Sequence, residues 1–221
     1  GPRLPIGCKR VLVSNDWYPA LDRDHVAVEG SGIGRVVEEG IITEDGRLVE
    51  ADVLLLGTGF HSTEFLAPMQ ITGRGGQDLN EAWADGAEAY LGMTVPDFPN
   101  LFLLYGPNTN LGHNSIIVMI EAQVEYLVQA VDHLRRRPRA DVDVLPEVAD
   151  AYNRAIQDEI RDSVWNAGCD SWYRTASGKV TNNWPGAAYR YRLAARRFEP
   201  SHYRQTHRGP VGDRPAVPAP A

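Results

Sequence analysis

The chain of 221 residues contains 43% hydrophobic and 23% charged residues, the composition of an ordinary globular protein with one or two domains. Its net charge of −7 argues against a surface that binds nucleic acid. No apolar run approaches the ~20 residues of a membrane span, and no signal peptide is recognisable. Cys8 and Cys169 form neither a CxxC motif nor a zinc site, so we expect no metal centre and a reducing, cytoplasmic environment.

Extended segments are expected to dominate the first sixty residues. Short stretches rich in Val predict strands at 9–14, 25–29 and 33–37. The Asp-Gly pair at 45–46 predicts a hairpin turn. Residues 53–56 are apolar without alternation, which is typical of a central strand covered on both faces. That strand is expected to end in the turn Gly57-Thr58-Gly59.

Helical patterns follow further along the chain. A short helix is expected near 79–83, then a buried strand at 101–105. The strongest helix signal begins at Ile116, with Asn114 or Ser115 as its N-cap. Apolar residues at helical spacing predict its core-facing side: Ile116, Ile117, Ile120, Val124, Leu127, Val128, Val131 and Leu134.

A second helix is predicted after Pro146. Its apolar residues recur in i, i+4 register at Val148, Tyr152, Ile156, Ile160 and Val164. The basic cluster at 135–139 is interpreted as the cationic end of the preceding helix. Aromatic loops follow at 169–173 and 182–186, and the tail from about residue 202 is predicted to be disordered.

Three glycine-containing segments are candidates for ligand contact. GSGIGR at 30–35 lacks the third glycine of a dinucleotide fingerprint and precedes a hairpin rather than a helix, so we interpret it as a turn. The glycines of GTG at 57–59 allow either a ligand or another chain segment to approach closely. The hydroxyl of Thr58 slightly favours a ligand.

The loop GPNTNLGHN at 106–114 combines a preceding strand with a helix N-terminus, whose free N–H groups suit an anion or a carbonyl. It has no lysine and no third glycine, which disfavours a phosphate. Asparagine amides and backbone N–H groups can match the edge of a flat heterocycle. The alternative is a polar loop that satisfies its own hydrogen bonds, with His113 as a capping or packing residue.

Lys9-Arg10 and the aromatic pair Trp172-Tyr173 are ambiguous by themselves. Two adjacent cations before a strand are usually solvated, and a Trp-Tyr loop usually packs as a lid on the core. Their function is interpreted from the order of the sequence blocks in which they lie.

That order resembles a known family. The blocks are GCKR at 7–10, SNDWYPAL at 14–21, DVLLLGTGF at 52–60, AYLGMTVPDFPNLFLLYGPNTNLGHNSII at 89–117, CDSWY at 169–173 and NWPG at 183–186. Together they resemble the C-terminal half of flavin-dependent Baeyer–Villiger monooxygenases, class B enzymes of the flavin-containing monooxygenase superfamily. The resemblance covers about residues 2–200.

The resemblance implies an α/β fold, the C-terminal portion of a two-domain FAD/NAD(P)-binding Rossmann-like structure with an incomplete sheet and a helical C-terminal region. Residues 1–50 would end the NADPH-binding domain and 51–134 would belong to the FAD-binding domain. Residues 135–200 would form the helical C-terminal region, and 201–221 a disordered tail.

The resemblance also implies an NADPH-dependent flavoprotein monooxygenase, which uses O2 and a flavin peroxide to convert a small ketone or aldehyde into an ester or lactone. Arg10 would be catalytic, because a permanent cation with several donors steadies the peroxide and the oxyanion of the adduct. Lys9 would contact the 2′-phosphate of NADPH, and Trp172 would close over the nicotinamide. The remaining cofactor-binding residues implied are Gly57, Thr58, Gly59, Gly106, Asn108, Thr109, Asn110, Leu111 and Asn114.

Parts of the family pattern are missing from this sequence. It contains neither GxGxxG fingerprint nor the FxGxxxHxxx(W/F/Y) signature of the family. We therefore expect the N-terminal half of the same enzyme as a partner, and little cofactor binding by this chain alone. The alternatives are an N- or S-oxygenating flavin monooxygenase and an inert fragment or interaction module. A flavin disulfide reductase is disfavoured because there is no CxxC motif.

Overall fold

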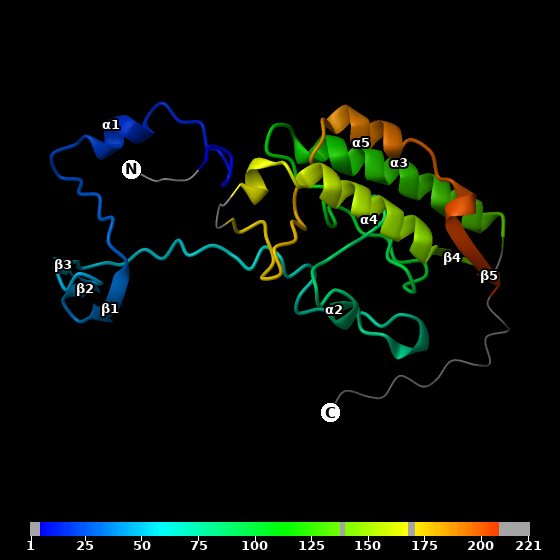
Figure 1. The fold of residues 1–221 in the computed structure, drawn as a ribbon, viewed down its shortest axis with the longest axis horizontal. Coiled ribbons are helices and arrows are strands. Elements are labelled where there is room, and N and C mark those ends of the chain that lie inside the picture. Colours follow the sequence, from blue (N-terminus) through cyan, green and yellow to red (C-terminus); the bar gives the residue numbers. More distant parts are fainter. Residues whose placement is uncertain (1–4, 138–139, 168–170, 208–221) are drawn as a thin grey trace. The chain divides into compact units, whose positions relative to one another are not determined.

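The computed structural model describes residues 5–137, 140–167 and 171–207. The chain divides into two compact units (Figure 1). One unit is Leu12–Phe60, and the other combines Gly1–Val11 with His61–Ala221. None of the helices in the described ranges is long and apolar enough to cross a membrane.

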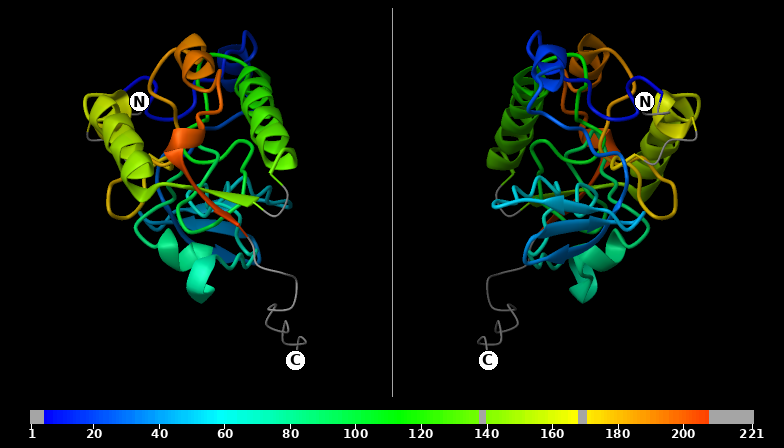
Figure 2. Two further views of the ribbon diagram at one scale, coloured as in Figure 1. Left: turned by 90° about the vertical axis from the view of Figure 1, so that its right-hand side faces the viewer. Right: turned by 90° about the vertical axis from the view of Figure 1, so that its left-hand side faces the viewer.

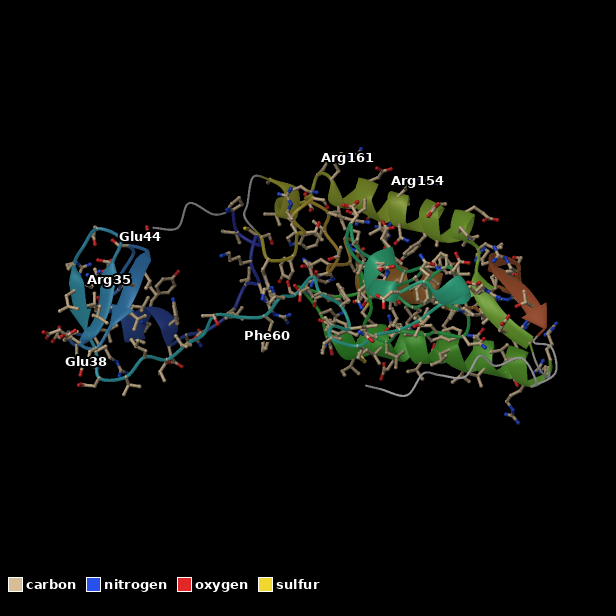
Figure 3. All side chains as sticks on the ribbon, turned by 90° about the horizontal axis from the view of Figure 1, so that it is seen from below. Arg35, Glu38, Glu44, Phe60, Arg154 and Arg161 are labelled. Atoms are coloured by element: carbon tan, nitrogen blue, oxygen red, sulfur yellow. The ribbon has the colours of Figure 1, made fainter. Side chains whose placement is uncertain are left out.

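The unit Leu12–Phe60 contains one short helix, α1 (Trp17–Leu21), and one antiparallel sheet. The sheet has the order β1-β2-β3 and consists of β1 (Ile33–Val37), β2 (Gly40–Thr43) and β3 (Leu48–Glu50). The strand predicted at 33–37 is therefore confirmed. Figure 3 labels Arg35, on β1, among the polar side chains that project from this sheet.

The turn between β2 and β3 is the hairpin that the Asp-Gly pair predicts. Gly46 adopts φ 86° and its N–H donates to the Thr43 carbonyl at 2.9 Å. The Thr43 hydroxyl donates to the Asp45 carboxylate and lowers the pKa of that group. Gly40 is required at the start of β2, because a Cβ there would lie 2.2 Å from the Val49 carbonyl oxygen.

The predicted central strand at 53–56 is wrong. Residues 52–60 form no strand, and Leu55, Leu56 and Phe60 are 93%, 83% and 90% exposed; Figure 3 labels Phe60 at the end of this segment. A strand needs neighbours that pair its N–H and C=O groups, and neither described sheet includes this segment. The strands predicted at 9–14 and 25–29 are wrong for the same reason.

The larger unit contains most of the helices. Its elements are η1 (Arg74–Gly76), α2 (Leu79–Ala82), α3 (Ile116–Arg135), β4 (Ala140–Val144), α4 (Pro146–Ile160), η2 (Val164–Asn166), α5 (Ala188–Ala194), η3 (Pro200–His202) and β5 (Tyr203–His207). Figures 1 and 2 show α5 lying alongside α3, with the antiparallel pair β4-β5 toward the C-terminal end of α3. Figure 3 labels Arg154 on α4 and Arg161 just after its end.

The helix starts follow the sequence signals. The Ser115 hydroxyl accepts from the Ile117 N–H at 3.2 Å, which confirms the predicted N-cap of α3. Asp78 caps α2 by accepting from two backbone N–H groups, and α4 begins at Pro146 as predicted. This last helix ends at Ile160, so Val164 lies beyond it in η2.

The predicted core-facing side of α3 is confirmed only in part, since Ile116 and Leu134 pack against the core. The helix buries Met119, Ala122, Gln123, Tyr126 and Ala130. Four of the predicted core residues are instead exposed, namely Ile117 (60%), Val124 (40%), Val128 (60%) and Val131 (45%). The helix is apolar on more than one side, and its buried polar residues favour the side that packs inward. The Tyr126 hydroxyl is hydrogen-bonded to the Tyr203 hydroxyl at 2.8 Å. The amide of Gln123 both accepts and donates a hydrogen bond in the core.

Two further expectations fail nearby. Residues 101–105 form no strand, although the Leu103 N–H donates to the Met93 carbonyl at 2.8 Å. Residues 203–207, predicted to be disordered, form β5, because the buried Tyr203 packs on Phe198 with ring centroids 4.9 Å apart. The rest of the predicted tail, 208–221, lies outside the described residues.

Candidate functional site

The predicted site residues are divided between the two units. Gly57, Thr58 and Gly59 lie in Leu12–Phe60, and the others lie in the larger unit. Thr58 is exposed, and a Cβ on either glycine would meet no atom within 4 Å. Gly59 has φ 79°, which favours glycine by backbone conformation alone. Ligand contact at this turn stays a prediction.

Asn108 anchors the loop 106–111. It is 2% exposed with φ 55°, a left-handed conformation that Asn tolerates. Its backbone N–H donates to the Thr181 carbonyl at 2.7 Å. Its amide Nδ2 donates to the carbonyls of Val180 and Asn183 at 2.9 and 3.0 Å. The side chain thus fastens the loop to residues 180–183 instead of facing solvent.

A close approach of two glycines shapes the same loop. A Cβ on Gly106 would lie 2.3 Å from the Gly92 carbonyl oxygen, and a Cβ on Gly92 would lie 2.2 Å from Cγ2 of Thr109. Thr109 is fully buried, and its hydroxyl donates to the Gly106 carbonyl at 2.7 Å. Packing within the protein therefore already requires glycine at position 106.

Asn110 is held on both sides. Its Nδ2 donates to Oδ1 of Asn183 at 2.7 Å, and its Oδ1 accepts from the Tyr105 hydroxyl at 2.9 Å. Its N–H donates to the Asn182 carbonyl, and its carbonyl accepts from the Trp184 N–H, both at 2.9 Å. The half-buried Asn110 is thus the point where the loop, Tyr105 and the NWPG segment meet.

The N-terminus of α3 opens at the end of this loop. Leu111 is fully buried, whereas residues 112–115 are exposed. Oδ1 of Asn114 accepts from the Ser115 N–H at 2.7 Å. The first turn of a helix carries unpaired N–H groups and a partial positive charge, and α3 presents them at the surface.

The segment 7–10 is hydrogen-bonded to the Trp172 loop. Oγ of Ser171 donates to the Cys8 carbonyl at 2.8 Å and accepts from the Tyr173 N–H at 3.3 Å. Trp172 is 46% exposed, and its ring lies 5.0 Å from that of Tyr173. Its carbonyl accepts from the hydroxyl of Ser62. Two blocks that are far apart in sequence therefore meet in the fold.

Arg10 acts electrostatically on two tyrosines of this region. Burial raises the pKa of Tyr105 and of Tyr173, and the Arg10 charge opposes the rise at both pKa values. Arg10 and Lys9 are exposed, and within the described part of the chain neither has a carboxylate partner. The geometry thus leaves uncompensated positive charge beside the 106–111 loop.

The cysteine expectation requires a correction. The Cys8 side chain is fully buried and disulfide-bonded, which goes against the reducing environment inferred from cysteine spacing. Spacing along the chain does not report proximity in space. In the ranges that the structure covers, no group of three or more His, Cys, Asp or Glu residues could hold a metal ion.

Sequence reasoning missed several residues that build this site. Tyr105 and Ser171 lie inside blocks with a family resemblance, but no local signal marks their contacts. Ser62 follows GTGF without any motif. Gln123, fully buried, was hidden among the apolar residues of α3; its Oε1 accepts from the Tyr105 N–H at 2.9 Å, and its Nε2 donates to the Tyr191 hydroxyl at 2.9 Å.

The chain is similar to several curated monooxygenases. An FAD-binding monooxygenase, ktnD, of Aspergillus niger is 45% identical over 195 residues, which are 86% of this chain and 32% of that protein. A Baeyer–Villiger monooxygenase of Pseudomonas aeruginosa is 42% identical over 207 residues, 93% of this chain and 39% of that protein. One of Streptomyces coelicolor is 39% identical over 215 residues, 95% of this chain and 41% of that protein. No protein-family model matches the chain.

Solved structures agree with these relatives. An oxidized steroid monooxygenase bound to NADP matches with a TM-score of 0.76 and 29% identity, over 87% of this chain and 36% of that one. A closed cyclohexanone monooxygenase matches with a TM-score of 0.74 and 26% identity, over 85% of this chain and 36% of that one. The chain spans about a third to two fifths of the length of these proteins. The resemblance seen in the sequence is therefore confirmed: the chain is similar to Baeyer–Villiger monooxygenases over part of their length.

Proposed function

We propose that this chain is part of an FAD- and NADPH-dependent monooxygenase that inserts one oxygen atom of O2 next to the carbonyl of a small ketone or aldehyde. The proposal is supported by the names of the relatives and by their identity to this chain over most of its length. Solved relatives include complexes with NADP and with FAD and NADP. The product would be an ester or a lactone.

The observation that carries the proposal is that the charge of Arg10 is not neutralised by a carboxylate in the described residues. Its cation has no carboxylate partner among the described residues and acts on the phenols of Tyr105 and Tyr173. Oxygen insertion next to a carbonyl develops negative charge on the former carbonyl oxygen. A guanidinium stays charged and offers several donors in a fixed fork, so it stabilises such an oxyanion.

The residues present fit the two cofactors in part. FAD supplies the oxygen activation and NADPH the reducing equivalents when they are bound. Lys9, an exposed point charge without a carboxylate partner in the described chain, would hold the 2′-phosphate of NADPH, and the half-exposed Trp172 would cover its nicotinamide. The exposed N-terminus of α3 would favour the electron-rich edge of the flavin ring.

The remaining proposed cofactor residues would act in two ways. Asn108, Thr109 and Leu111 are buried, so we propose that they maintain the shape of the loop and do not contact a cofactor directly. Gly106 is buried as well and shapes the loop; the residues that would approach a cofactor through backbone or exposed polar atoms are Gly57, Thr58, Gly59, Asn110 and Asn114.

The proposed organisation assigns 1–50 to an NADPH-binding domain, 51–134 to an FAD-binding domain, 135–200 to a helical C-terminal region and 201–221 to a tail. The sheet of this Rossmann-like fold would be completed by the rest of the enzyme, which is the proposed protein partner. Supporting observations are the partial coverage of the relatives and the exposed apolar residues at 53–56 and on α3.

A cytoplasmic location, where NADPH is supplied, belongs to the same proposal. The disulfide at Cys8 is the observation that speaks against it. Alkylation of the cysteines in cells measures their redox state: free thiols would support the cytoplasmic location, and a disulfide would contradict it.

The function is tested with the complete polypeptide that carries this chain. After purification with FAD and NADPH, cyclohexanone and thioanisole are offered separately, and the products are identified by mass spectrometry. We expect a lactone from the ketone; sulfoxide without any lactone would assign the protein to the N- or S-oxygenating flavin monooxygenases instead. The chain of 221 residues alone is expected to stay colourless with FAD, and a complete polypeptide that also stays colourless would contradict the proposal.

A further inference from the structure

Ser171 occupies a buried position between two segments of the proposed site. It is 4% exposed. Its hydroxyl donates to the Cys8 carbonyl at 2.8 Å and accepts from the Tyr173 N–H at 3.3 Å. The carbonyl that it holds lies two residues before Arg10, and its own neighbour along the chain is Trp172. One hydroxyl therefore touches both the segment that carries Arg10 and the loop that carries Trp172.

A second serine continues this connection to the 106–111 loop. The hydroxyl of Ser62 donates to the Trp172 carbonyl. The Ser62 carbonyl accepts from Nδ2 of Asn182 at 2.8 Å, and the Asn182 carbonyl accepts from the Asn110 N–H at 2.9 Å. A continuous series of hydrogen bonds thus joins the Trp172 loop to the polar loop before α3.

We propose that Ser171 is a positioning residue that couples the placement of Arg10 to the placement of the Trp172 loop. The inference rests on the proposed function, since that function gives Arg10 and Trp172 their roles. A displacement of Trp172 moves the adjacent Ser171, whose hydroxyl bonds the Cys8 carbonyl, and thereby moves the backbone that leads to Arg10. Ser62 holds the loop in the position that lets Ser171 reach Cys8.

The chemistry favours serine at this position. Removing the hydroxyl takes one donor from the buried Cys8 carbonyl and one acceptor from the Tyr173 N–H. A buried polar group that loses its partner pays its full desolvation cost, so the segment shifts toward water or another donor. The disulfide of Cys8 also anchors this segment, so the effect of the Ser171 hydroxyl on Arg10 is measured with that disulfide reduced.

Tyr105 provides a readout of the Arg10 position. Arg10 lowers the pKa of Tyr105, whereas the hydrogen bonds of Tyr105 go to Asn110 and Gln123 and not to Ser171. The pKa of Tyr105 therefore reports where Arg10 is, independently of stability. It is measured on the 221-residue chain by NMR of labelled tyrosine rings, with a reducing agent present so that the disulfide of Cys8 does not hold the segment.

Four variants define the experiment. Arg10→Ala gives the pKa of Tyr105 without the Arg10 charge, which we expect to be higher. Ser171→Ala is expected to raise the same pKa toward the Arg10→Ala value, and Ser171→Thr, which keeps a hydroxyl, to raise it less. Ser62→Ala, at a half-buried position that is easier to vary, is expected to give a smaller rise. Ser177→Ala is the control, because Ser177 is exposed and bonds the Thr175 hydroxyl.

The complete polypeptide supplies the catalytic readout. Ser171→Ala is expected to lower the ester formed per NADPH oxidised by about tenfold, the factor for one lost buried hydrogen bond. The inference is overturned if Ser171→Ala and Ser62→Ala both leave the Tyr105 pKa at the wild-type value. It is also overturned if Arg10→Ala leaves that pKa unchanged. If the wild type makes no ester, the proposed function fails, while the Tyr105 titration still decides whether Ser171 positions Arg10.

Discussion

At the level of single residues, the candidate site depends on a cation that lacks a carboxylate partner in the described chain. Arg10 influences Tyr105 and Tyr173. In the complete polypeptide, Arg10→Ala should lower lactone formation on the order of a hundredfold, because an oxyanion loses its main donor. NADPH oxidation should persist, since the hydride step does not need that charge. Product and NADPH are measured in the same reaction.

Arg161→Ala is the matched control for this change. Arg161 lies just after α4 and pairs with Asp158, with side chains 72% and 63% exposed. Loss of such an exposed pair alters stability little, and activity should be unchanged. Lactone formation at the wild-type level in Arg10→Ala would remove Arg10 from the mechanism.

Asn108 is expected to matter for stability more than for direct cofactor contact. Asn108→Ala removes the Nδ2 donor from the Asn183 carbonyl and from the Val180 carbonyl, which keeps Nε2 of Gln157, and it puts Ala at φ 55°. The loss should be about 1–3 kcal/mol for the buried polar groups, with about 1 kcal/mol more for the left-handed backbone. Urea unfolding of the chain measures it. Asn114→Ala, at an exposed position, should cost less than half as much; equal costs would contradict the anchoring role.

Buried tyrosines predict a loss of stability at alkaline pH. Burial raises the pKa of Tyr90 to about 12, from 10.0 when exposed. A phenol with a raised pKa contributes stability that is fully present below about pH 10 and is lost as pH rises toward 12. The pKa values of Tyr126, Tyr191 and Tyr203 are raised by burial as well.

The test compares urea unfolding at pH 8, 10 and 11. Stability should fall between the last two pH values, and Tyr90→Phe should fall less steeply. At pH 8 the same variant loses the hydrogen bond to Nδ1 of His202, which is 2.8 Å from the Tyr90 hydroxyl. A wild-type profile that stays flat to pH 11 would contradict the assignment.

Among the elements, α3 offers the most direct test of the proposed protein partner. It exposes a stripe formed by Ile117, Val124, Val128 and Val131, which fits packing against the proposed rest of the enzyme. Val128→Glu should change the stability of the 221-residue chain by less than about 0.5 kcal/mol, as surface changes do. In the complete polypeptide the same change should lower FAD retention, measured by flavin absorbance after gel filtration.

Ala130→Glu is the control for the opposite face of α3. Ala130 is fully buried, so a carboxylate there is expected to unfold the chain or cost several kcal/mol. If Val128→Glu destabilised the isolated chain as strongly, the stripe would already be packed within it.

For the whole molecule, the two units differ in how much they bury. Gly40 and Thr43 are the buried residues between positions 12 and 60, whereas the larger unit has a core of twenty residues around α3, α4 and α5. Few buried contacts mean a low free energy of local opening. Limited proteolysis of the chain should therefore cut first within 12–60, and hydrogen exchange should protect α3 and α5 longest. Equal protection of both units would show that the smaller one has partners beyond those described.

Sequence reasoning succeeded where the signal was local. The cap at Ser115, the proline that starts α4, and the Asp-Gly hairpin depend on neighbours a few residues away. It failed at 53–56 and 101–105, where strand formation depends on distant partners. On α3 it succeeded only in part, because apolar residues occur on more than one side and buried partners such as Tyr203 determine which side packs inward.

The sequence by itself determined the resemblance to Baeyer–Villiger monooxygenases, because the order and spacing of its blocks are a property of the chain that needs no contacts. It also determined the helix starts and the β2-β3 turn, for the same local reason. The tertiary structure decided which side of α3 is buried and which side chains of the 106–111 loop serve the loop itself. It also brought Cys8, Ser62 and Ser171 together. Those outcomes depend on hydrogen bonds between residues up to 163 positions apart, and sequence spacing carries no information about such pairs.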